Sequence, residues 1–363
     1  MRSKKNKKGF ISRIKNPFLR TAVVAAMTLG GMCLAAFCTF YIVIVLGASK
    51  TLQETWICTA MHTFKHQYLA TWFFSDEKIA EVLERNSVVD DEYNSVLPSE
   101  DDFTNEDNSK PTFDTTGMYE LEGYEEISSG IYLKEVSGVS GVSSWCGYVM
   151  LIEDPTRIRI VDTPAQFDHG WTVMQMVESV GGIAGINGGG FFDGENFDSN
   201  GGSPAGILIE DGVLVNPSYS DQSVYNLIGF NSKGNFILRH ATAGWAIDND
   251  IKNAVSFSPY IVVNGEGLVK NGTGGWGISP RTGIGQRESG EVLFIVIDGR
   301  QPGYSIGSDL DGLQQIMLEE KCINGAMMDG GSSTAMVFGG EYINRPSLGH
   351  ERWINNCWVV MGD

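Results

Sequence analysis

Cysteine and histidine are too sparse in this sequence to supply a disulfide framework or a common metal motif. Six cysteines occur in 363 residues, and three of them lie in or beside an N-terminal apolar run. The others are Cys146, Cys322 and Cys357, so at most one disulfide can form among them within a chain. Cys322 could pair with either of the other two. We expect a hydrophobic core, rather than disulfides, to stabilise the fold.

Familiar nucleotide-binding and hydrolase signatures are also missing. The sequence has no phosphate loop ending in Gly-Lys-Ser or Gly-Lys-Thr, and residues 188–190 lack the spacing of a dinucleotide-binding loop. No Gly-x-Ser-x-Gly nucleophile elbow is present. His169, His240 and His350 stand outside any metal motif, which is typical of structural or surface histidines.

Acidic residues are absent from residues 1–50 and abundant afterwards. Nine of the 26 Lys and Arg residues lie in this first segment, which leaves 17 basic against 44 acidic residues, a formal charge of −27 for residues 51–363. Nucleic acid attracts clustered Lys and Arg, so we predict no nucleic-acid partner. The acidic balance favours solubility, and partners that are not polyanions or are bridged by cations.

Residues 22–46 form a long uncharged run, AVVAAMTLGGMCLAAFCTFYIVIVL. This length spans a hydrocarbon core as one helix. Eight Lys and Arg residues precede it, so the positive-inside rule places residues 1–21 in the cytoplasm and the remainder outside the cell membrane. A cleaved signal peptide is the alternative, but the run is long for one and LGASK is a weak cleavage sequence.

Residues 47–86 are predicted to be a juxtamembrane helical segment. His62 and His66 are four residues apart, a spacing that could hold zinc. The wider pattern favours an aromatic helix face that contacts lipid or a partner helix, and a homo-oligomer formed through this segment is one interpretation. The helical stripe consists of Leu52, Trp56, Ala60, Phe64, Tyr68 and Trp72.

An acidic, polar stretch separates this segment from the rest of the chain. Residues 87–115 lack apolar periodicity and predict a linker that cannot fold alone. Residues 116–363 are then expected to form one extracytoplasmic domain with a sizeable core.

The composition of this domain predicts strands with a few helices. Asp211-Gly212 predicts a hairpin turn, and capping boxes predict helices that begin at Thr172 and Ser308. We expect an α+β fold in which helices pack on a mixed β-sheet core. Buried strands are predicted at 148–152, 157–161, 259–263, 292–297 and 357–361.

Two segments of the domain resemble each other. Residues 177–192 and 319–334 align with a constant offset, so that Asn187 falls on Asp329. Each reads as a helix, a turn, an apolar strand, one polar residue and then glycines. An internal pseudo-repeat would explain this, as would chance similarity between short Gly-rich strings. In either case two strands end in similar chemistry.

Polar groups gather at four expected strand ends, in residues 187–193, 279–283, 298–301 and 329–333. Ligand sites of sheet proteins gather beyond strand ends, where glycines let backbone N–H groups approach. Asp-Gly and Gly-Gly also occur in ordinary turns, so one segment alone would mean little. Four in one domain indicate a site.

The segments GINGGGFFD, SPRTGIG, VIDGRQPGYSIGSDLDGL and DGGSSTAMV, in this order, resemble the phosphodiester glycosidase family. CGYVMLIEDPTRIRI is similar to that family's first strands, and the resemblance covers about residues 120–363. The anchored layout resembles the versions from Gram-positive bacteria. One position departs from the family, which usually has Asn where this chain has Met327.

The resemblance implies hydrolysis of a sugar-1-phosphodiester, and the polar residues suit that chemistry. A phosphate monoester is a good leaving group, so the site needs a cation for phosphate and a carboxylate for the sugar. We predict Asp329 as nucleophile or water-activating base, with Asp298 in reserve. Arg281 would bind phosphate in a bidentate way, and Asn187 would fix sugar hydroxyls or the attacking water. The other predicted substrate-binding residues are Arg300, Thr282, Gly188, Gly189, Asp193, Gly330, Gly331, Ser332 and Ser333.

The expected substrate is a cell-wall, capsule or exopolysaccharide glycan, but two other interpretations stay open. Met327 favours a non-catalytic carbohydrate-binding module that organises surface polymer. An assembly protein acting through residues 50–86 is the other. The sequence requires no cofactor, although Asp193, Asp298 and Asp329 could bind calcium or magnesium. Such a cation would offset repulsion between the acidic domain and an anionic polymer.

Overall fold

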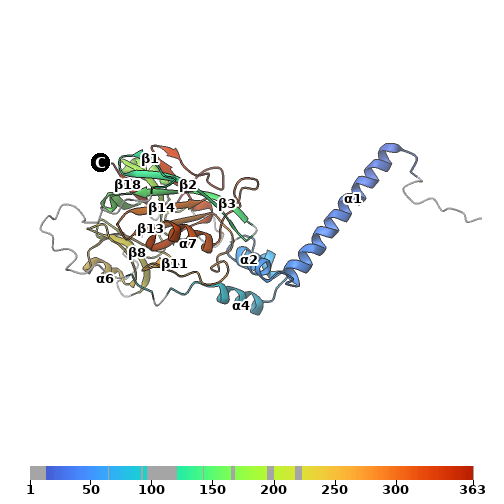
Figure 1. The fold of residues 1–363 in the computed structure, drawn as a ribbon, viewed down its shortest axis with the longest axis horizontal. Coiled ribbons are helices and arrows are strands. Elements are labelled where there is room, and N and C mark those ends of the chain that lie inside the picture. Colours follow the sequence, from blue (N-terminus) through green and yellow to red (C-terminus); the bar gives the residue numbers. More distant parts are fainter. Residues whose placement is uncertain are drawn as a thin grey trace, which may run out of the picture. The chain divides into compact units, whose positions relative to one another are not determined.

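The structure is a computed structural model that describes residues 14–63, 65–90, 93–95, 121–141, 143–164, 168–193, 200–216 and 223–362. The chain forms two compact units, and the boundary between them lies between Trp56 and Ile57. The order of helices and strands can be followed in Figure 1. Most of the predicted linker, residues 96–115, lies outside the described residues.

The first unit contains the apolar helix that the sequence predicts. Helix α1 (Pro17–Phe40) continues into the π-helical turn η2 (Tyr41–Val45). It starts earlier than residue 22 because the Asn16 side chain accepts hydrogen bonds from Phe18 N (2.9 Å) and Leu19 N (3.3 Å), and Pro17 suits the first helical position. Residues 17–45 are long and apolar enough to cross a membrane, which fits a single-pass anchor or a signal sequence.

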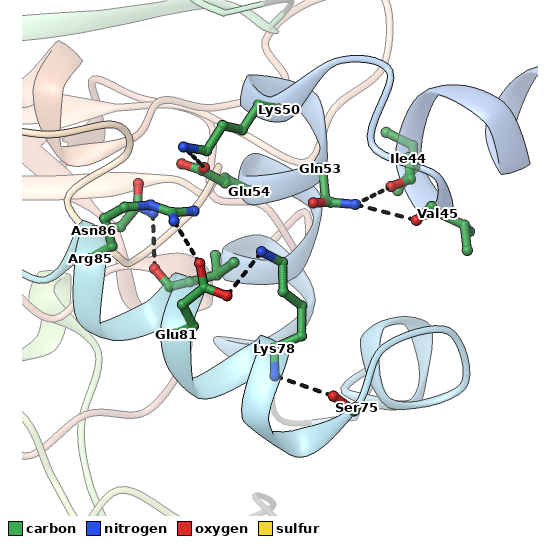
Figure 2. Close-up of polar contacts among 11 residues, drawn as sticks. Ile44, Val45, Lys50, Gln53, Glu54, Ser75, Lys78, Glu81, Arg85 and Asn86 are labelled. Atoms are coloured by element: carbon green, nitrogen blue, oxygen red, sulfur yellow. Dashed lines mark hydrogen bonds and ion pairs between the residues drawn. The ribbon is translucent and has the colours of Figure 1, made fainter.

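The predicted juxtamembrane helix is interrupted. It forms α2 (Lys50–Met61), α3 (Tyr68–Thr71) and α4 (Asp76–Asn86), so the four-residue stripe does not lie on one continuous helix. Figure 2 shows Glu81 of α4 between Lys78 (3.1 Å) and Arg85 (2.9 Å). In the first unit, the Gln53 amide donates to Ile44 O at 2.7 Å.

Residues 57–86 have a small core of their own inside the second unit. Its buried side chains are Ile57, Cys58, Ala60, Ala70, Ile79 and Val82. The buried Asn86 side chain accepts a hydrogen bond from Thr273 N at 3.3 Å, which joins α4 to a loop of the C-terminal domain. The helical segment therefore packs as part of the domain that follows it.

Three antiparallel sheets form the C-terminal domain. The first contains, in spatial order, β1 (Glu125–Ser128), β2 (Ile131–Ser140), β3 (Ser143–Ile152), β14 (Val292–Ile297), β13 (Arg281–Arg287), β15 (Cys322–Met328), β11 (Tyr260–Val263) and β12 (Glu266–Gly267). The second contains β7 (Val213–Leu214), β6 (Leu208–Glu210), β10 (Ile251–Ser256), β8 (Tyr225–Asn231) and β9 (Phe236–Ala241). The third contains β17 (Glu341–Tyr342), β16 (Met336–Phe338), β5 (Gly182–Asn187), β18 (Asn356–Met361) and β4 (Ile158–Asp162).

The α+β class predicted from the sequence is confirmed, but the expected mixed sheet is not. Among the described residues, all pairings between neighbouring strands of the three sheets are antiparallel. Apolar runs such as β14 are buried on both faces, a pattern that does not distinguish parallel from antiparallel strands.

The largest core lies where the three sheets meet. It contains Phe294 from the first sheet, Phe230 from the second and Trp358 from the third. Each sheet also packs against one helix on its other face. Helix α7 (Leu310–Glu319) covers the first sheet, α6 (Ala243–Asp248) the second and α5 (Val173–Ser179) the third. Because both faces of the sheets are covered, few strands alternate between apolar and polar residues.

The two predicted helix starts differ in outcome. Thr172 caps α5 with a capping box through Gln175, as predicted. The start of α7 is one residue later than predicted, because the Asp309 carboxylate rather than Ser308 accepts Gly312 N (3.0 Å). The predicted hairpin turn at Asp211-Gly212 is confirmed between β6 and β7.

The structure bears on the predicted linker and on the possible disulfide. Part of the stretch predicted as linker packs on the sheets, because buried Asp90 accepts from Tyr260 N (2.9 Å) and Ser95 N donates to Leu238 O (2.8 Å). In the described structure no disulfide joins Cys146, Cys322 and Cys357.

Candidate active site

Strands β5 and β15, which end the two similar sequence segments, bring their ends together. The Asn187 side chain donates to Asp329 O at 2.5 Å, and Asp329 N donates to Gly188 O at 3.1 Å. Asn187 Oδ1 also accepts from Thr282 Oγ1 (2.7 Å) and Ala335 N (3.1 Å). The buried Asn187 therefore fixes the backbone that carries Asp329, and its amide is already engaged within the protein.

A cavity of about 1360 Å³ opens beside this junction. Small-molecule sites usually measure about 300–1,000 Å³, so this cavity has room for a substrate with more than one chemical group. Eight of the predicted site residues line it: Asp193, Arg281, Arg300, Asp329, Gly330, Gly331, Ser332 and Ser333. Five others are not among the lining residues: Asn187, Gly188, Gly189, Thr282 and Asp298.

Asp329 combines exposure to the cavity with an unusual proton affinity. Burial raises the pKa of its carboxyl to about 6, and the charge of Asp193 acts in the same direction. A hydrogen bond from Ser333 and the charge of Arg352 partly oppose this rise in pKa. Such a group changes charge close to neutral pH, which is the range in which acid–base and nucleophilic groups work.

Arg300 is placed to act together with Asp329. Its backbone has φ 61°, and its Nη2 donates to Ser279 Oγ at 3.2 Å. Burial lowers the pKa of Arg300, and the charge of Asp329 opposes that change. A Cβ on Gly331 would lie 3.0 Å from Arg300 Nη2, so the glycine leaves space for this guanidinium. The arginine therefore lies over the backbone that follows Asp329.

Arg281 lines the cavity, but its guanidinium is largely engaged. Its Nε donates to Ser308 O (3.0 Å), and its Nη2 donates to Trp276 O (3.1 Å) and to Gly277 O. Burial lowers its pKa to about 10, so it remains a cation at neutral pH. Because Nε and Nη2 already donate to carbonyls, Nη1 is left to contact a phosphate, and the expected bidentate contact stays a prediction.

Asp298 has a different environment from Asp329. Its buried carboxylate accepts from Tyr304 OH (2.9 Å), Asn344 Nδ2 (2.9 Å) and Arg345 N (3.1 Å). These bonds join the segment after β14 to the segment after β17 (Glu341–Tyr342). The arrangement supports a structural contribution from Asp298, in place of the reserve catalytic role that the sequence suggested.

Gly188 and Gly189 contact protein rather than the cavity. A Cβ at Gly188 would lie 2.1 Å from Asn356 Oδ1, and that oxygen accepts a hydrogen bond from Gly189 N at 2.8 Å. The glycines were predicted to allow a ligand to approach, but what approaches here is the Asn356 side chain of β18. Thr282 is likewise buried and bonded to Asn187.

Several lining residues were missed in the sequence. Arg352 forms an ion pair with Asp193 and lies over the Phe191 ring at 4.8 Å. Lys65 comes from the segment between α2 and α3. The charged lining residues are Lys65, Arg281, Arg300 and Arg352 against Asp193 and Asp329, so four cations face two anions, a formal charge of +2.

The net positive charge of the cavity lining bears on whether a bridging calcium or magnesium ion is needed. A positive cavity can attract a phosphate within a strongly acidic domain without a bridging cation. Within the described part of the chain, no three Asp, Glu, His or Cys residues are grouped as a metal site. Asp193 and Asp329 line the cavity and Asp298 does not. That no cofactor is required, and that calcium or magnesium could bind, both stay predictions.

Known proteins resemble this chain in sequence and in fold. A curated relative, the SPbeta prophage-derived uncharacterized protein YomE of Bacillus subtilis (strain 168), is 29% identical over 200 residues, which cover 52% of this chain and 29% of the relative. This chain thus spans less than a third of that relative's length.

Two solved structures give the fold comparison. The zebrafish N-acetylglucosamine-1-phosphodiester alpha-N-acetylglucosaminidase catalytic domain, auto-inhibited by its pro-peptide, superposes with a TM-score of 0.56 at 19% identity, over 66% of this chain and 86% of that one. A hypothetical protein from Synechocystis gives a TM-score of 0.47 at 14% identity, over 65% and 63%. The sequence profile of the phosphodiester glycosidases matches residues 181–361, and this part of the chain belongs to the phosphodiester glycosidase family.

Proposed function

We propose that this protein hydrolyses sugar-1-phosphodiesters at the bond between the anomeric carbon and the phosphate oxygen. The observation that carries the proposal is Asp329, a carboxylate whose pKa is raised by burial to about 6 in a cavity where four cationic side chains face only one other anion, Asp193. The family membership of residues 181–361 supports the same reaction class.

The chemistry needs little help from an acid. As the bond from C1 to oxygen breaks, positive charge develops on the sugar and negative charge on the departing phosphate monoester. Arg300 would receive the developing phosphate charge, with Arg281 and Arg352 adding to the local positive potential. The hydroxyl of Ser332 can donate to the phosphate oxygens, whereas that of Ser333 donates to Asp329.

Asp329 would act on the sugar side of that bond. As a nucleophile it would bond to C1 while the phosphate monoester leaves, and water would then release the sugar and restore the carboxylate. As a base it would take a proton from water that attacks C1 directly. In either case it must be ionised, and Asn187 holds its backbone in place through the 2.5 Å contact.

The substrate we propose is a surface glycan outside the cell membrane, such as a wall polymer, capsule or exopolysaccharide with sugar phosphodiester linkages. The apolar span at residues 17–45 would hold the C-terminal domain there. The zebrafish relative acts, by its name, on an N-acetylglucosamine-1-phosphodiester, which makes an N-acetylated sugar the first candidate.

The pH dependence of hydrolysis provides a test of the role of Asp329. Because the pKa is raised to about 6, the active carboxylate should be depleted below that pH and fully present above it. We expect kcat/KM to rise about tenfold for each pH unit below the midpoint and to level off above it. A profile measured from pH 4 to 8 on a glycosyl phosphodiester would reveal the midpoint. A rate that falls as pH rises through 6 would contradict this role.

A non-catalytic carbohydrate-binding module is the second candidate, and Met327 is the observation that favours it. Met327 lines the cavity with only 1% of its surface exposed and packs in an apolar cluster with Leu313 and Met317. It therefore cannot replace the amide group usual in the family. Time-dependent hydrolysis by the purified protein would eliminate this candidate.

A further inference from the structure

The end of α2 and the segment that follows it form part of the cavity wall. Thr59, His62, Thr63, Lys65 and His66 all line the cavity, although more than a hundred residues separate them from the strand ends that provide Asp329 and Arg300. The family profile begins at residue 181 and so does not extend to this segment.

Direct backbone contact holds this segment against the domain. Ile278 N donates to Thr59 Oγ1 at 3.0 Å. Gly277 has φ 61°, and a Cβ on it would lie 2.4 Å from Thr59 Cα, so a larger residue would push the two backbones apart. Gly277 O also accepts from Arg281 Nη2. The segment is therefore connected to the phosphate side of the cavity through one short loop.

Aromatic rings line this part of the cavity. The His62 and Trp276 ring centroids are 4.9 Å apart with an angle of 36° between the ring planes. Phe257 continues the surface, with its ring centroid 6.4 Å from that of Trp276. Trp276 O accepts a hydrogen bond from Arg281, which holds the backbone of Trp276 next to that cation. All three rings line the cavity.

His62 presents a hydrogen-bond acceptor at this surface. Its Nδ1 lies 3.0 Å from Cys58 O, and a carbonyl only accepts, so Nδ1 carries the hydrogen. Burial lowers the pKa of His62, and the nearby Arg281 charge lowers it further, which favours the neutral ring. Neutral Nε2 then offers a lone pair that suits a hydroxyl donor and repels a phosphate oxygen.

We propose that Trp276, Phe257 and His62 form a sugar-binding subsite that the juxtamembrane segment completes. The apolar C–H face of a pyranose would pack on the Trp276 and Phe257 rings, and a sugar hydroxyl would donate to His62 Nε2. The inference rests on the proposed function in assigning the sugar to a phosphodiester substrate. The binding of a neutral sugar itself does not depend on hydrolysis.

The experiment measures sugar and phosphate binding separately. The full-length chain in detergent, carrying Asp329→Asn to prevent turnover, is titrated with the methyl glycosides of glucose, galactose, N-acetylglucosamine and N-acetylgalactosamine, and with glycerol phosphate. We expect Trp276→Ala to weaken binding of the preferred glycoside at least tenfold, and His62→Ala to weaken it about threefold to tenfold. Glycerol phosphate affinity should change less than twofold in both variants.

A conservative variant and a matched pair serve as controls. His62→Gln should keep most of the affinity, because its amide oxygen can occupy the position of Nε2, whereas His62→Asn should behave like His62→Ala. His169 and Trp353 form another ring pair, 5.9 Å apart, and do not line the cavity. Ala substitutions there should leave glycoside binding unchanged.

The outcomes separate this inference from the proposed function. Unchanged glycoside binding in Trp276→Ala, binding of no glycoside at all, or equal loss of glycerol phosphate binding would overturn the subsite. Tighter binding in His62→Ala would also overturn it, since the segment would then obstruct the site. Glycoside binding that depends on Trp276 in a native protein without hydrolytic activity would support the subsite and refute the proposed function.

Discussion

Asp329→Asn is expected to lower kcat for hydrolysis of a glycosyl phosphodiester by about 10²–10⁴-fold, because the amide neither attacks C1 nor removes a proton from water. The substitution keeps the shape of the side chain and leaves the contact between Asn187 and the Asp329 backbone intact. The measurement is release of free sugar over time. Full activity in this variant would contradict the assignment of Asp329.

The same substitution should stabilise the domain at high pH. The folded pKa of about 6 lies above the ordinary value of 3.8, so ionisation is harder in the folded state and stability falls as pH rises through 6. Two pKa units correspond to about 3 kcal/mol, which is an upper limit for the gain. We expect Asp329→Asn to increase the free energy of unfolding at pH 8 and to change it little at pH 4.

Asp248→Asn is the matched control for this stability measurement, because Asp248 is exposed at the end of α6 and does not line the cavity. It should leave unfolding unchanged at both pH values. Destabilisation of Asp329→Asn at pH 8 would show that burial does not raise the energy of the carboxylate. In that case the ionised Asp329 would not cost the folded protein stability in exchange for activity.

Arg300→Ala is expected to lower kcat/KM by about 10²–10³-fold, because a departing phosphate would lose the guanidinium that we propose receives its charge. Arg300 bonds to Ser279 Oγ at 3.2 Å and interacts with the charge of Asp329, but its remaining N–H groups can bind a substrate oxygen. Arg300→Lys should recover only part of the activity, since an ammonium lacks the planar fork. Binding of inorganic phosphate should weaken in parallel.

Arg159→Ala controls for the loss of one positive charge. Arg159 forms an exposed ion pair with Asp211 at 3.6 Å and does not line the cavity. Its removal should change kcat/KM less than twofold. Equal effects in Arg159→Ala and Arg300→Ala would mean that only the overall charge matters.

The sequence identified the strand ends better than it identified what each residue does there. Strands β5 and β15 end where their apolar runs stop, so Asn187 and Asp329 could be assigned to one site. The sequence does not show that Asn187 bonds to Thr282 and Ala335 and so faces the protein. In a sequence, an Asn that follows an apolar run gives the same pattern whether its amide binds substrate or the protein backbone.

The residues that were missed come from outside the four expected strand ends. Arg352 precedes β18 and reaches the cavity because β18 pairs with β5, a pairing between segments far apart in the chain. The sequence pattern places His62 on a lipid-facing or partner-facing helix, and no periodicity indicates that this helix ends at Met61. Only the tertiary fold brings that segment to Trp276.

The most direct test of the central claim is the position of bond cleavage in ¹⁸O-labelled water. The purified protein is incubated with a panel of sugar-1-phosphodiesters, and both products are analysed by mass spectrometry. Attack at C1, as proposed for Asp329, places ¹⁸O in the free sugar and none in the phosphate monoester. Label in the phosphate product would show cleavage at phosphorus and would contradict the account.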